Sequence, residues 1–302
     1  MYKRLAQILP KEIIKFNEDL QKYSTFGIGG KALAVLEPRN KAELIKCVKG
    51  CKRLSLKYLV VGNGSNLLFS TRNLRRVVIT TKKMQDKISY YQTRVVVNAG
   101  MMISEFILWC KDKGFSGLEN LFGIPATVGG MVMMNASAFG CSIYDNLEYV
   151  EVFEKGKVKI IDKRQIALEP HKTNLLESAK IILSVCFSFD RLAPSVIASK
   201  IKEVACLRQK RQPVGKSAGC VFRNPLGNSA GKIIDELGFK GYKINDSFVS
   251  EKHANFIINL ESATDTDVKK IIKVIQNKAK KEKGITLERE IEFIGDRDEY
   301  YW

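Results

Sequence analysis

At 302 residues, with 45% hydrophobic and 27% charged residues, the chain has the composition of a globular protein and room for two domains. It contains no run of about 18 or more apolar residues, and its first residues lack the apolar core and cleavage site of a signal peptide. We therefore expect a cytoplasmic protein without a membrane partner.

The formal net charge of +18 is compatible with nucleic-acid binding, because clustered cations displace counterions from phosphate. Here the cations are spread along the whole chain, and the densest run, at 277–284, ends a predicted helix, where cations complement the helix dipole. We favour a lysine-rich solvated surface and expect no nucleic-acid partner. A positive field would still attract anionic nucleotides.

The seven cysteines are irregularly spaced and include no C-x-x-C pair, and the chain has only two histidines. Cys47 and Cys51 are spaced to share a helix face, where packing explains them better than zinc binding does. We expect no metal site.

The first half of the chain mixes predicted helices and strands. A helix is predicted over 40–51, with Asn40 as its N-cap and Glu43 completing a capping box. A second helix is predicted from Ile103 to a stop at Gly114. Runs of β-branched and apolar residues predict strands at 58–61, 77–80, 94–98, 147–153 and 181–189.

A second region is expected to begin near 190–200, and we divide the chain into domains at 1–195 and 196–302. Periodicity alone leaves both an α/β and an α+β fold open. The predicted elements of this region are a helix on Ile197, Ile201, Val204 and Leu207, a polar loop at 208–217, a strand at 255–259, a helix from 268 that ends at Gly284, and a strand at 290–294.

Two glycine-rich loops indicate phosphate binding. The first, Gly62-Asn-Gly-Ser-Asn66, follows a predicted strand, and its glycines let backbone N–H groups approach a phosphate. It is not the dinucleotide-binding fingerprint, because no helix with a third glycine follows it. The second runs from Gly117 to Gly130, and its residues Gly123, Pro125, Gly129 and Gly130 are predicted to make a stiff loop with open backbone donors. Two such loops favour a large phosphate-bearing cofactor, although a packing role for the glycines stays open.

Seven motifs follow one another along the chain. Those of the first half are Ser24-Thr-Phe-Gly-Ile-Gly-Gly30, Val61-Gly-Asn-Gly-Ser-Asn-Leu-Leu68, and Gly123-Ile-Pro-Ala-Thr-Val-Gly-Gly130 with Asn135-Ala-Ser-Ala-Phe-Gly140. Those of the second half are Ala218-Gly-Cys-Val-Phe-Arg-Asn-Pro225, Ala230-Gly-Lys-Ile-Ile-Asp235, His253-Ala-Asn-Phe256 and Gly284-Ile-Thr-Leu-Glu-Arg-Glu-Ile-Glu292. In this order they resemble the MurB family of UDP-N-acetylenolpyruvoylglucosamine reductases, in its shorter type.

The resemblance implies an α+β fold, with a two-part FAD-binding domain of the vanillyl-alcohol-oxidase (PCMH) class and a smaller α+β C-terminal substrate domain. It implies FAD and NADPH as cofactors and UDP-N-acetylglucosamine enolpyruvate as substrate, in peptidoglycan precursor synthesis. In the implied reaction NADPH reduces FAD, hydride then passes to C3 of the enolpyruvyl group, and C2 takes a proton. We expect a monomer.

The resemblance also assigns the residues that hold the cofactor. They are Gly62, Asn63, Gly64, Ser65, Asn66, Gly123, Ile124, Pro125, Thr127, Gly129, Gly130, Asn135, Ala138 and Gly140.

Three positions are implied to act in the second step. Cys220 stands where the family has its serine acid, and a thiol, with an ordinary pKa near 8.5, is a reasonable proton donor. Glu290 matches the glutamate that supports the enol. His171 falls at the position of a family arginine, and neither it nor Lys172 offers the bidentate fork of arginine. The candidate substrate-binding residues are Arg211, Arg223 and Asn224.

Three alternatives remain. The replaced arginine favours a catalytically weakened or non-catalytic FAD-binding relative. Another FAD-dependent sugar or alcohol oxidoreductase is less favoured, because such an enzyme would share only the FAD loops. A nucleic-acid-binding protein is favoured by charge alone.

Overall fold

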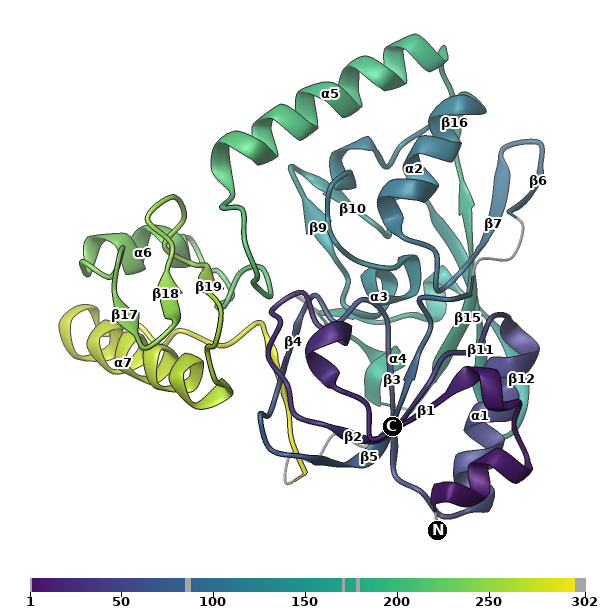
Figure 1. Cartoon of the computed structure of the whole chain (residues 1–302). Coiled ribbons are helices and arrows are strands. Elements are labelled where there is room, and N and C mark those ends of the chain that lie inside the picture. Colours follow the sequence, from purple (N-terminus) through teal and green to yellow (C-terminus); the bar gives the residue numbers. More distant parts are fainter. Residues whose placement is uncertain (1, 85–87, 170–171, 178–179, 297–302) are drawn as a thin grey trace.

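The computed structural model describes residues 2–84, 88–169, 172–177 and 180–296, and it has an α+β architecture. Figure 1 shows a larger N-terminal part with two sheets and, to one side, a smaller C-terminal lobe. The long helix α5 (Pro194–Arg211) crosses the top of the larger part and leads toward that lobe (Figure 1).

The first sheet has the strand order β1-β2-β5-β3. Strand β5 lies between β2 and β3 and is parallel to both, whereas β1 is antiparallel to β2. The central strands are almost fully buried, as their apolar runs predict. The predicted strands at 58–61 and 77–80 are confirmed. The bounds are β1 (Ile14–Phe16), β2 (Ala32–Leu36), β3 (Tyr58–Val61) and β5 (Leu74–Thr80).

Helix α1 (Lys41–Arg53) begins where the sequence predicts, because the Asn40 side chain accepts a hydrogen bond from the Glu43 backbone N–H at 2.9 Å. The predicted capping box is wrong in its second half. The Glu43 carboxylate accepts from the backbone N–H of Arg39 at 2.8 Å and pairs with the Arg39 guanidinium. Cys47 and Cys51 are buried on the inner face of α1.

The second sheet has the order β12-β11-β15-β7-β6, and all neighbouring strands are antiparallel. Helices α2 (Ile103–Asp112) and α3 (Val128–Met133) contribute to the core on this sheet. The predicted strands at 94–98, 147–153 and 181–189 are confirmed, as is the helix that ends before Gly114. The strands are β6 (Ser89–Tyr91), β7 (Arg94–Asn98), β11 (Leu147–Glu154), β12 (Lys157–Asp162) and β15 (Ile181–Ser188).

Short elements fill the connections of the larger part. Three two-stranded pairs are β8 (Phe115–Ser116) with β16 (Asp190–Arg191), β9 (Ser137–Ala138) with β10 (Cys141–Ser142), and β13 (Leu168–Glu169) with β14 (Lys172–Thr173). The short helices are η1 (Tyr2–Gln7), η2 (Lys11–Ile13), η3 (Leu20–Tyr23), η4 (Glu119–Leu121), η5 (Lys163–Gln165) and α4 (Asn174–Glu177).

The C-terminal lobe packs two helices against a three-stranded antiparallel sheet. The predicted helix that ends at Gly284 is confirmed, and Gly284 takes a left-handed φ of 68° at its C-cap. The elements are α6 (Ala230–Glu236), β17 (Lys243–Ile244), β18 (Ser247–Val249), β19 (Ile257–Asn259) and α7 (Asp265–Lys283).

Two predicted strands of this region are shorter than expected. Strand β19 starts at Ile257, because Asn255 bonds to a different segment. Its side chain exchanges hydrogen bonds with the backbone of Phe222, and its carbonyl accepts from the Val221 N–H. The last strand, β20 (Glu292–Ile294), starts two residues late because the backbone N–H of Glu290 bonds to the Val221 carbonyl at 2.8 Å.

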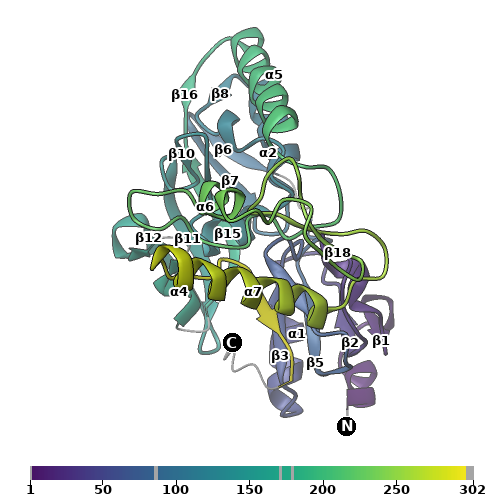
Figure 2. The same cartoon turned by 90° about the vertical axis from the view of Figure 1, so that its left-hand side faces the viewer.

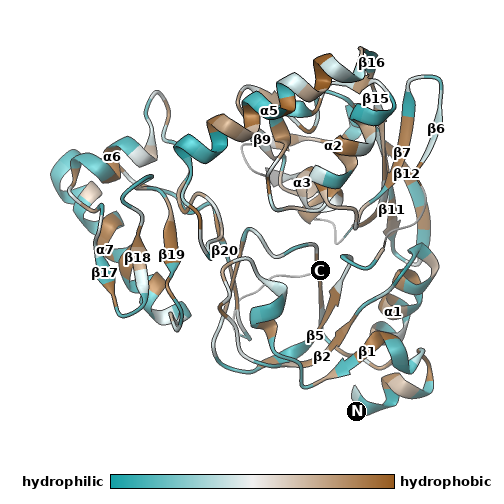
Figure 3. Ribbon diagram, turned by 45° about the horizontal axis from the view of Figure 1, so that its top comes forward, coloured by the Kyte–Doolittle hydropathy of each residue, from teal (hydrophilic) through white to brown (hydrophobic). Residues whose placement is uncertain are grey.

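Helix α5 is longer than predicted and continues to Arg211, so residues 208–211 are helical and not part of the polar loop. Its ribbon alternates between hydrophobic and hydrophilic colours in Figure 3. The hydrophobic side places Ile197 and Ile201 in the core of the larger part. Of the helices within the described residues, not one is both long and apolar enough for a membrane span.

The two parts of the chain are fastened together by a strand and by polar contacts. After α7 the chain returns to the larger part (Figure 2), where β20 pairs in parallel with β4 (Leu67–Phe69). The buried Asn259 amide donates to the carbonyl oxygens of Phe26 and Gly27, at 3.0 and 3.3 Å. These contacts fix the lobe beside the glycine-rich loop that precedes β4.

Candidate active site

A cavity of about 1180 Å³ lies where the larger part, the end of α5 and the C-terminal lobe meet. Pockets for drug-sized ligands span about 300–1,000 Å³, so this cavity has room for a large cofactor together with part of a second ligand. Its walls come from segments 59–67, 122–127, 205–220 and 290–294, among others.

The loop from Gly62 to Asn66 leaves β3 and forms one wall of the cavity. Within the described chain, the backbone N–H groups of Asn63, Gly64, Ser65 and Asn66 donate no hydrogen bond to the protein. Gly64 has a φ of +65°, and a Cβ there would lie 2.1 Å from the Tyr23 carbonyl oxygen. Four successive open donors in a loop held this closely form a concave site for phosphate oxygens.

The two glycine-rich loops meet in space, although they are far apart in the chain. The Asn63 amide donates to the Pro125 carbonyl at 2.7 Å. A Cβ on Gly62 would lie 2.3 Å from Thr127 Oγ1, so only glycine permits this approach. The prediction that both loops serve one site therefore agrees with their placement.

The prediction that the second loop has open backbone donors is wrong at several positions. The N–H groups of Gly123, Gly129 and Gly130 donate to Ser104 Oγ, the Ala99 carbonyl and Thr127 Oγ1, respectively. The Gly129 position also packs against Ala99, where a Cβ would lie 2.7 Å from the alanine Cβ. Here Gly129 is needed for packing against Ala99, and the run of four open donors belongs to the first loop.

Most of the residues assigned to the cofactor line the cavity. They are Gly62, Asn63, Gly64, Ser65, Asn66, Gly123, Ile124, Pro125, Thr127, Gly130 and Ala138. Three do not: Gly129 packs against Ala99, the Asn135 side chain accepts a hydrogen bond from Ser142 at 3.4 Å, and Gly140 is exposed.

Cys220 and Glu290 come together in the cavity wall although they are distant in sequence. Cys220 forms a β-bridge with Phe256, and the Glu290 main chain is held by Val221 on one side and by the Asn66 amide, at 3.2 Å, on the other. Burial, and secondarily the negative charge of Glu290, raises the pKa of the Cys220 thiol to about 12. The thiol is therefore protonated at neutral pH.

His171 lies outside the described residues, and only the backbone of Lys172 is described, in β14. The neighbouring Thr173 is buried, lines the cavity and donates its hydroxyl to the Met133 carbonyl at 3.1 Å. The segment that replaces the family arginine motif therefore reaches the cavity.

The three predicted substrate-binding residues do not line the cavity. Arg211 is exposed on the last turn of α5. Arg223 is half-buried, with Nη1 3.9 Å from a carboxylate oxygen of Glu288. The Asn224 side chain accepts a hydrogen bond from the Ala230 N–H at 3.0 Å, so it caps the turn before α6.

Arg208 lines the cavity and was not predicted from the sequence. It follows Val204 by four residues on the same helix face as Ile197 and Ile201. The signal available in the sequence was the helical spacing of Arg208 from these apolar residues. It was missed because a loop was expected to start at residue 208.

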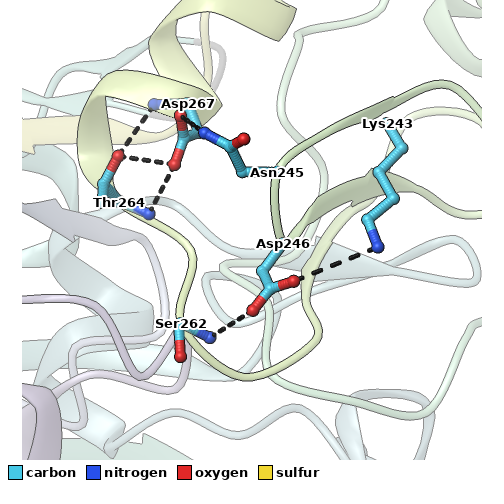
Figure 4. Close-up of a pocket in the computed structure, with 6 residues that line it drawn as sticks. All are labelled: Lys243, Asn245, Asp246, Ser262, Thr264 and Asp267. Atoms are coloured by element: carbon cyan, nitrogen blue, oxygen red, sulfur yellow. Dashed lines mark hydrogen bonds and ion pairs between the residues drawn. The ribbon is translucent and has the colours of Figure 1, made fainter.

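A separate shallow depression in the lobe is shown in Figure 4. Its polar groups are engaged in local structure. Thr264 and Asp267 form the capping box of α7, Asn245 donates to Asp267 at 2.9 Å, and Asp246 accepts from the Ser262 N–H at 3.0 Å. We assign this depression a structural role.

Two family models match the chain. One, described as the C-terminal domain of UDP-N-acetylenolpyruvoylglucosamine reductase, matches residues 209–294. The other, described as an FAD binding domain, matches residues 32–162.

Similar proteins share most of their length with this chain. The UDP-N-acetylenolpyruvoylglucosamine reductase of Caldicellulosiruptor saccharolyticus is 36% identical over 294 residues, which cover 95% of this chain and 94% of that protein. The protein of the same name from Fusobacterium nucleatum is 34% identical over 279 residues, covering 91% and 97%. The crystal structure of UDP-N-acetylenolpyruvylglucosamine reductase (MurB) from Thermus caldophilus gives a TM-score of 0.78 at 33% identity, covering 93% and 97%. The predicted fold class is confirmed.

Proposed function

The chain belongs to the UDP-N-acetylenolpyruvoylglucosamine reductase family, and we propose that its cavity is where UDP-N-acetylglucosamine enolpyruvate is reduced to UDP-N-acetylmuramate. The protein is an FAD-dependent oxidoreductase that uses NADPH, and its product is a precursor of peptidoglycan. The observation that carries the proposal is the meeting of Cys220, Glu290 and the open N–H groups of loop 62–66 in one cavity.

The residues of the cavity fit an FAD molecule. Bound FAD supplies the hydride chemistry of the reaction, between NADPH and the enol ether. The open donors of loop 62–66 suit its diphosphate, and segment 123–127 forms the adjoining wall. Tight contact between Gly62 and Thr127 holds these two binding segments in a fixed relation.

We assign Cys220 as the acid that gives a proton to C2 of the enolpyruvyl group. A general acid must carry its proton at the working pH and must reach the substrate. Burial keeps the pKa of this thiol at about 12, and the side chain lines the cavity. Such a thiol stays protonated, and can donate its proton, at every pH in which the protein is expected to work.

We assign Glu290 as the carboxyl group that supports the enol beside the acid. Its charge acts on the Cys220 thiol, and its main chain is held between Val221 and Asn66. These backbone hydrogen bonds hold residue 290 at a fixed position beside loop 62–66. The carboxyl group therefore starts from a fixed point next to the cofactor that the loop is proposed to bind.

The pKa of Cys220 predicts slow alkylation. At pH 8 a thiol with a pKa of about 12 is ionised to about one part in ten thousand, and only the thiolate reacts. In a Cys206→Ser background, which removes the exposed cysteine, iodoacetamide should modify Cys220 far more slowly than it modifies Cys206 in the unaltered protein. Glu290→Gln should speed the modification, because it removes a charge that raises the pKa. Peptide mass spectrometry measures both rates, and a fast reaction at Cys220 would contradict the assignment.

His171 is proposed to replace the family arginine when protonated. A cationic imidazole is present below its pKa, ordinarily about 6.5, and is lost as the pH rises. The rate of flavin reoxidation by the enol ether should therefore fall as the pH rises from 6 to 8. A flat profile of this rate over that interval would remove His171 from the mechanism and leave the charge to another group.

An anaerobic two-stage experiment tests the function. The purified protein is bleached with NADPH, and UDP-N-acetylglucosamine enolpyruvate is then added while the flavin absorbance is recorded. Bleaching followed by prompt recovery supports the reductase. A protein that bleaches and does not recover supports the second candidate, a catalytically weakened or non-catalytic relative, which the histidine at the arginine position favours. A colourless protein that takes up no FAD would contradict both.

We propose an FAD-binding domain over 1–195 and a substrate-binding domain over 196–302, joined by α5. We also propose that the protein is a cytoplasmic monomer with no nucleic-acid or membrane partner.

A further inference from the structure

Asn255 belongs to the motif His253-Ala-Asn-Phe256, to which the proposed function assigns no role. It lies in a turn, and only 3% of the residue is exposed. A buried amide has to form hydrogen bonds, because an unsatisfied donor or acceptor is costly away from water. The partners of the Asn255 amide therefore show what this residue does.

The first partners of Asn255 are in the segment that carries the acid. Its Nδ2 donates to the Phe222 carbonyl at 2.8 Å, and its Oδ1 accepts from the Phe222 N–H at 2.9 Å. The Asn255 backbone carbonyl accepts from the Val221 N–H, also at 2.9 Å. Since Cys220 forms a β-bridge with Phe256, the acid and the two residues after it are all bound to this turn.

The segment that Asn255 holds also places Glu290. The Val221 carbonyl accepts a hydrogen bond from the Glu290 N–H at 2.8 Å. Phe222, whose backbone is bonded to the Asn255 amide, forms a β-bridge with Arg289. Asn255 thus fixes the segment to which residue 290 is bound, and with it the relation between the thiol and the carboxyl group.

The orientation of the amide leaves one hydrogen for the thiol. Because Oδ1 and Nδ2 bond to the N–H and the carbonyl of one residue, the two ends of the amide cannot be exchanged. Nδ2 carries two hydrogens, and Phe222 takes one of them. Burial and the charge of Glu290 raise the pKa of the Cys220 thiol, whereas a hydrogen bond from the Asn255 side chain lowers it. A bond that favours the thiolate comes from a donor, so the second Nδ2 hydrogen faces the sulfur.

We propose that Asn255 is a positioning residue for the acid, because it fixes the segment around Cys220 and directs the S–H hydrogen away from the amide and into the cavity. A thiol has a single hydrogen, and its sulfur is a weak acceptor. When an N–H of Asn255 occupies the amide side of the sulfur, the S–H hydrogen is left to face the cavity that Cys220 lines. The proposal rests on the proposed function, in which Cys220 gives its proton to the substrate.

Asn255→Asp separates the contact with the thiol from the hold on the segment. Aspartate keeps the size of the side chain and the oxygen that accepts from Phe222. Its second oxygen, protonated because it is buried beside a carbonyl, donates its only hydrogen to Phe222 and has none for the thiol. In the Cys206→Ser background, iodoacetamide at pH 8 should then modify Cys220 about threefold to tenfold more slowly, the effect of losing one hydrogen bond that favours the thiolate.

The half-reactions give a second readout of Asn255→Asp. Flavin reoxidation by the enol ether should slow by a similar factor, with FAD binding and the rate of flavin reduction by NADPH unchanged. A merely structural role would not slow the alkylation, because a loosened segment exposes the thiol and speeds its modification. Unchanged or faster alkylation of Cys220 would overturn the proposal.

Asn259→Asp is the matched control. Asn259 is also a buried amide, 2% exposed, and its side chain bonds to Phe26, Gly27 and Ala263. This substitution should leave the alkylation rate of Cys220 unchanged. Equal slowing in the two variants would also overturn the proposal, since the effect would then belong to any buried amide of the lobe.

A further measurement leaves Asn255 intact and does not depend on the folding of the aspartate variant. In Cys220→Ala, one of the two side-chain N–H hydrogens of Asn255 should exchange with solvent faster, because its partner is removed, whereas those of Asn259 should not change. NMR measures these rates, and equal rates with and without the thiol would overturn the proposal. Both tests of the contact use the resting enzyme. A flavin that bleaches and does not recover in the unaltered protein therefore contradicts the proposed function alone.

Discussion

Cys220→Ala is expected to leave flavin reduction by NADPH unchanged and to slow flavin reoxidation by the enol ether roughly 10²–10⁴-fold, which is the usual contribution of a positioned general acid. The variant removes the protonated thiol that lines the cavity beside Glu290. Anaerobic stopped-flow absorbance resolves the two half-reactions, because the first bleaches the flavin and the second restores its colour. A change confined to the second half-reaction identifies a proton donor to the substrate.

Two matched variants control this experiment. Cys220→Ser restores the residue of the family motif and should keep much of the reoxidation rate, because a hydroxyl donates a proton from the same position. Cys206→Ser changes an exposed cysteine on α5 and should have no effect. Reoxidation of the alanine variant at the rate of the unaltered enzyme would place the acid elsewhere.

Glu290→Gln is expected to lower the rate of the second half-reaction by roughly 10²–10³-fold, the range found when one group that stabilises developing charge is removed. Glutamine keeps the size of the side chain, and the backbone bonds of residue 290 to Val221 and Asn66 do not depend on the carboxylate. The loss should therefore be chemical and not positional. Single-turnover reoxidation measures it, with the FAD content and the reduction rate recorded alongside.

Glu288→Gln is the control for this prediction. Glu288 lies two residues earlier, and its side chain is 73% exposed, with a carboxylate oxygen 3.9 Å from Arg223 Nη1. Its carbonyl accepts a backbone hydrogen bond from Arg223 at 2.9 Å, which the substitution leaves in place. Its replacement should leave both half-reactions within about twofold of the unaltered rates, as expected for a solvated surface charge. Equal losses of rate in the two variants would mean that any negative charge removed from this segment slows the reaction. Glu290 would then have no specific role.

Elements that depend on local pattern were predicted well. Helix α1 starts at its Asn40 cap, α7 stops at Gly284, and β3 and β7 have the predicted bounds. The errors occur where a group other than the expected one, whether near in the chain or distant, forms the hydrogen bond. The Glu43 carboxylate accepts from the Arg39 N–H and not from the Asn40 N–H that a capping box requires. The strand predicted from residue 290 starts late because the Glu290 N–H donates to the Val221 carbonyl.

The site divides in the same way. The sequence by itself determined the periodic helices, the two glycine-rich loops and the motifs that mark Cys220 and Glu290, because each of these is written in neighbouring residues. Only the tertiary structure decided which loop keeps open N–H donors and which arginine enters the cavity. Those outcomes depend on contacts between distant segments. Asn63 and Pro125 are separated by 62 positions in the chain, and Asn66 and Glu290 by 224. A backbone N–H is open or hydrogen-bonded according to which group packs beside it, and the local sequence does not specify that group when it comes from a distant segment.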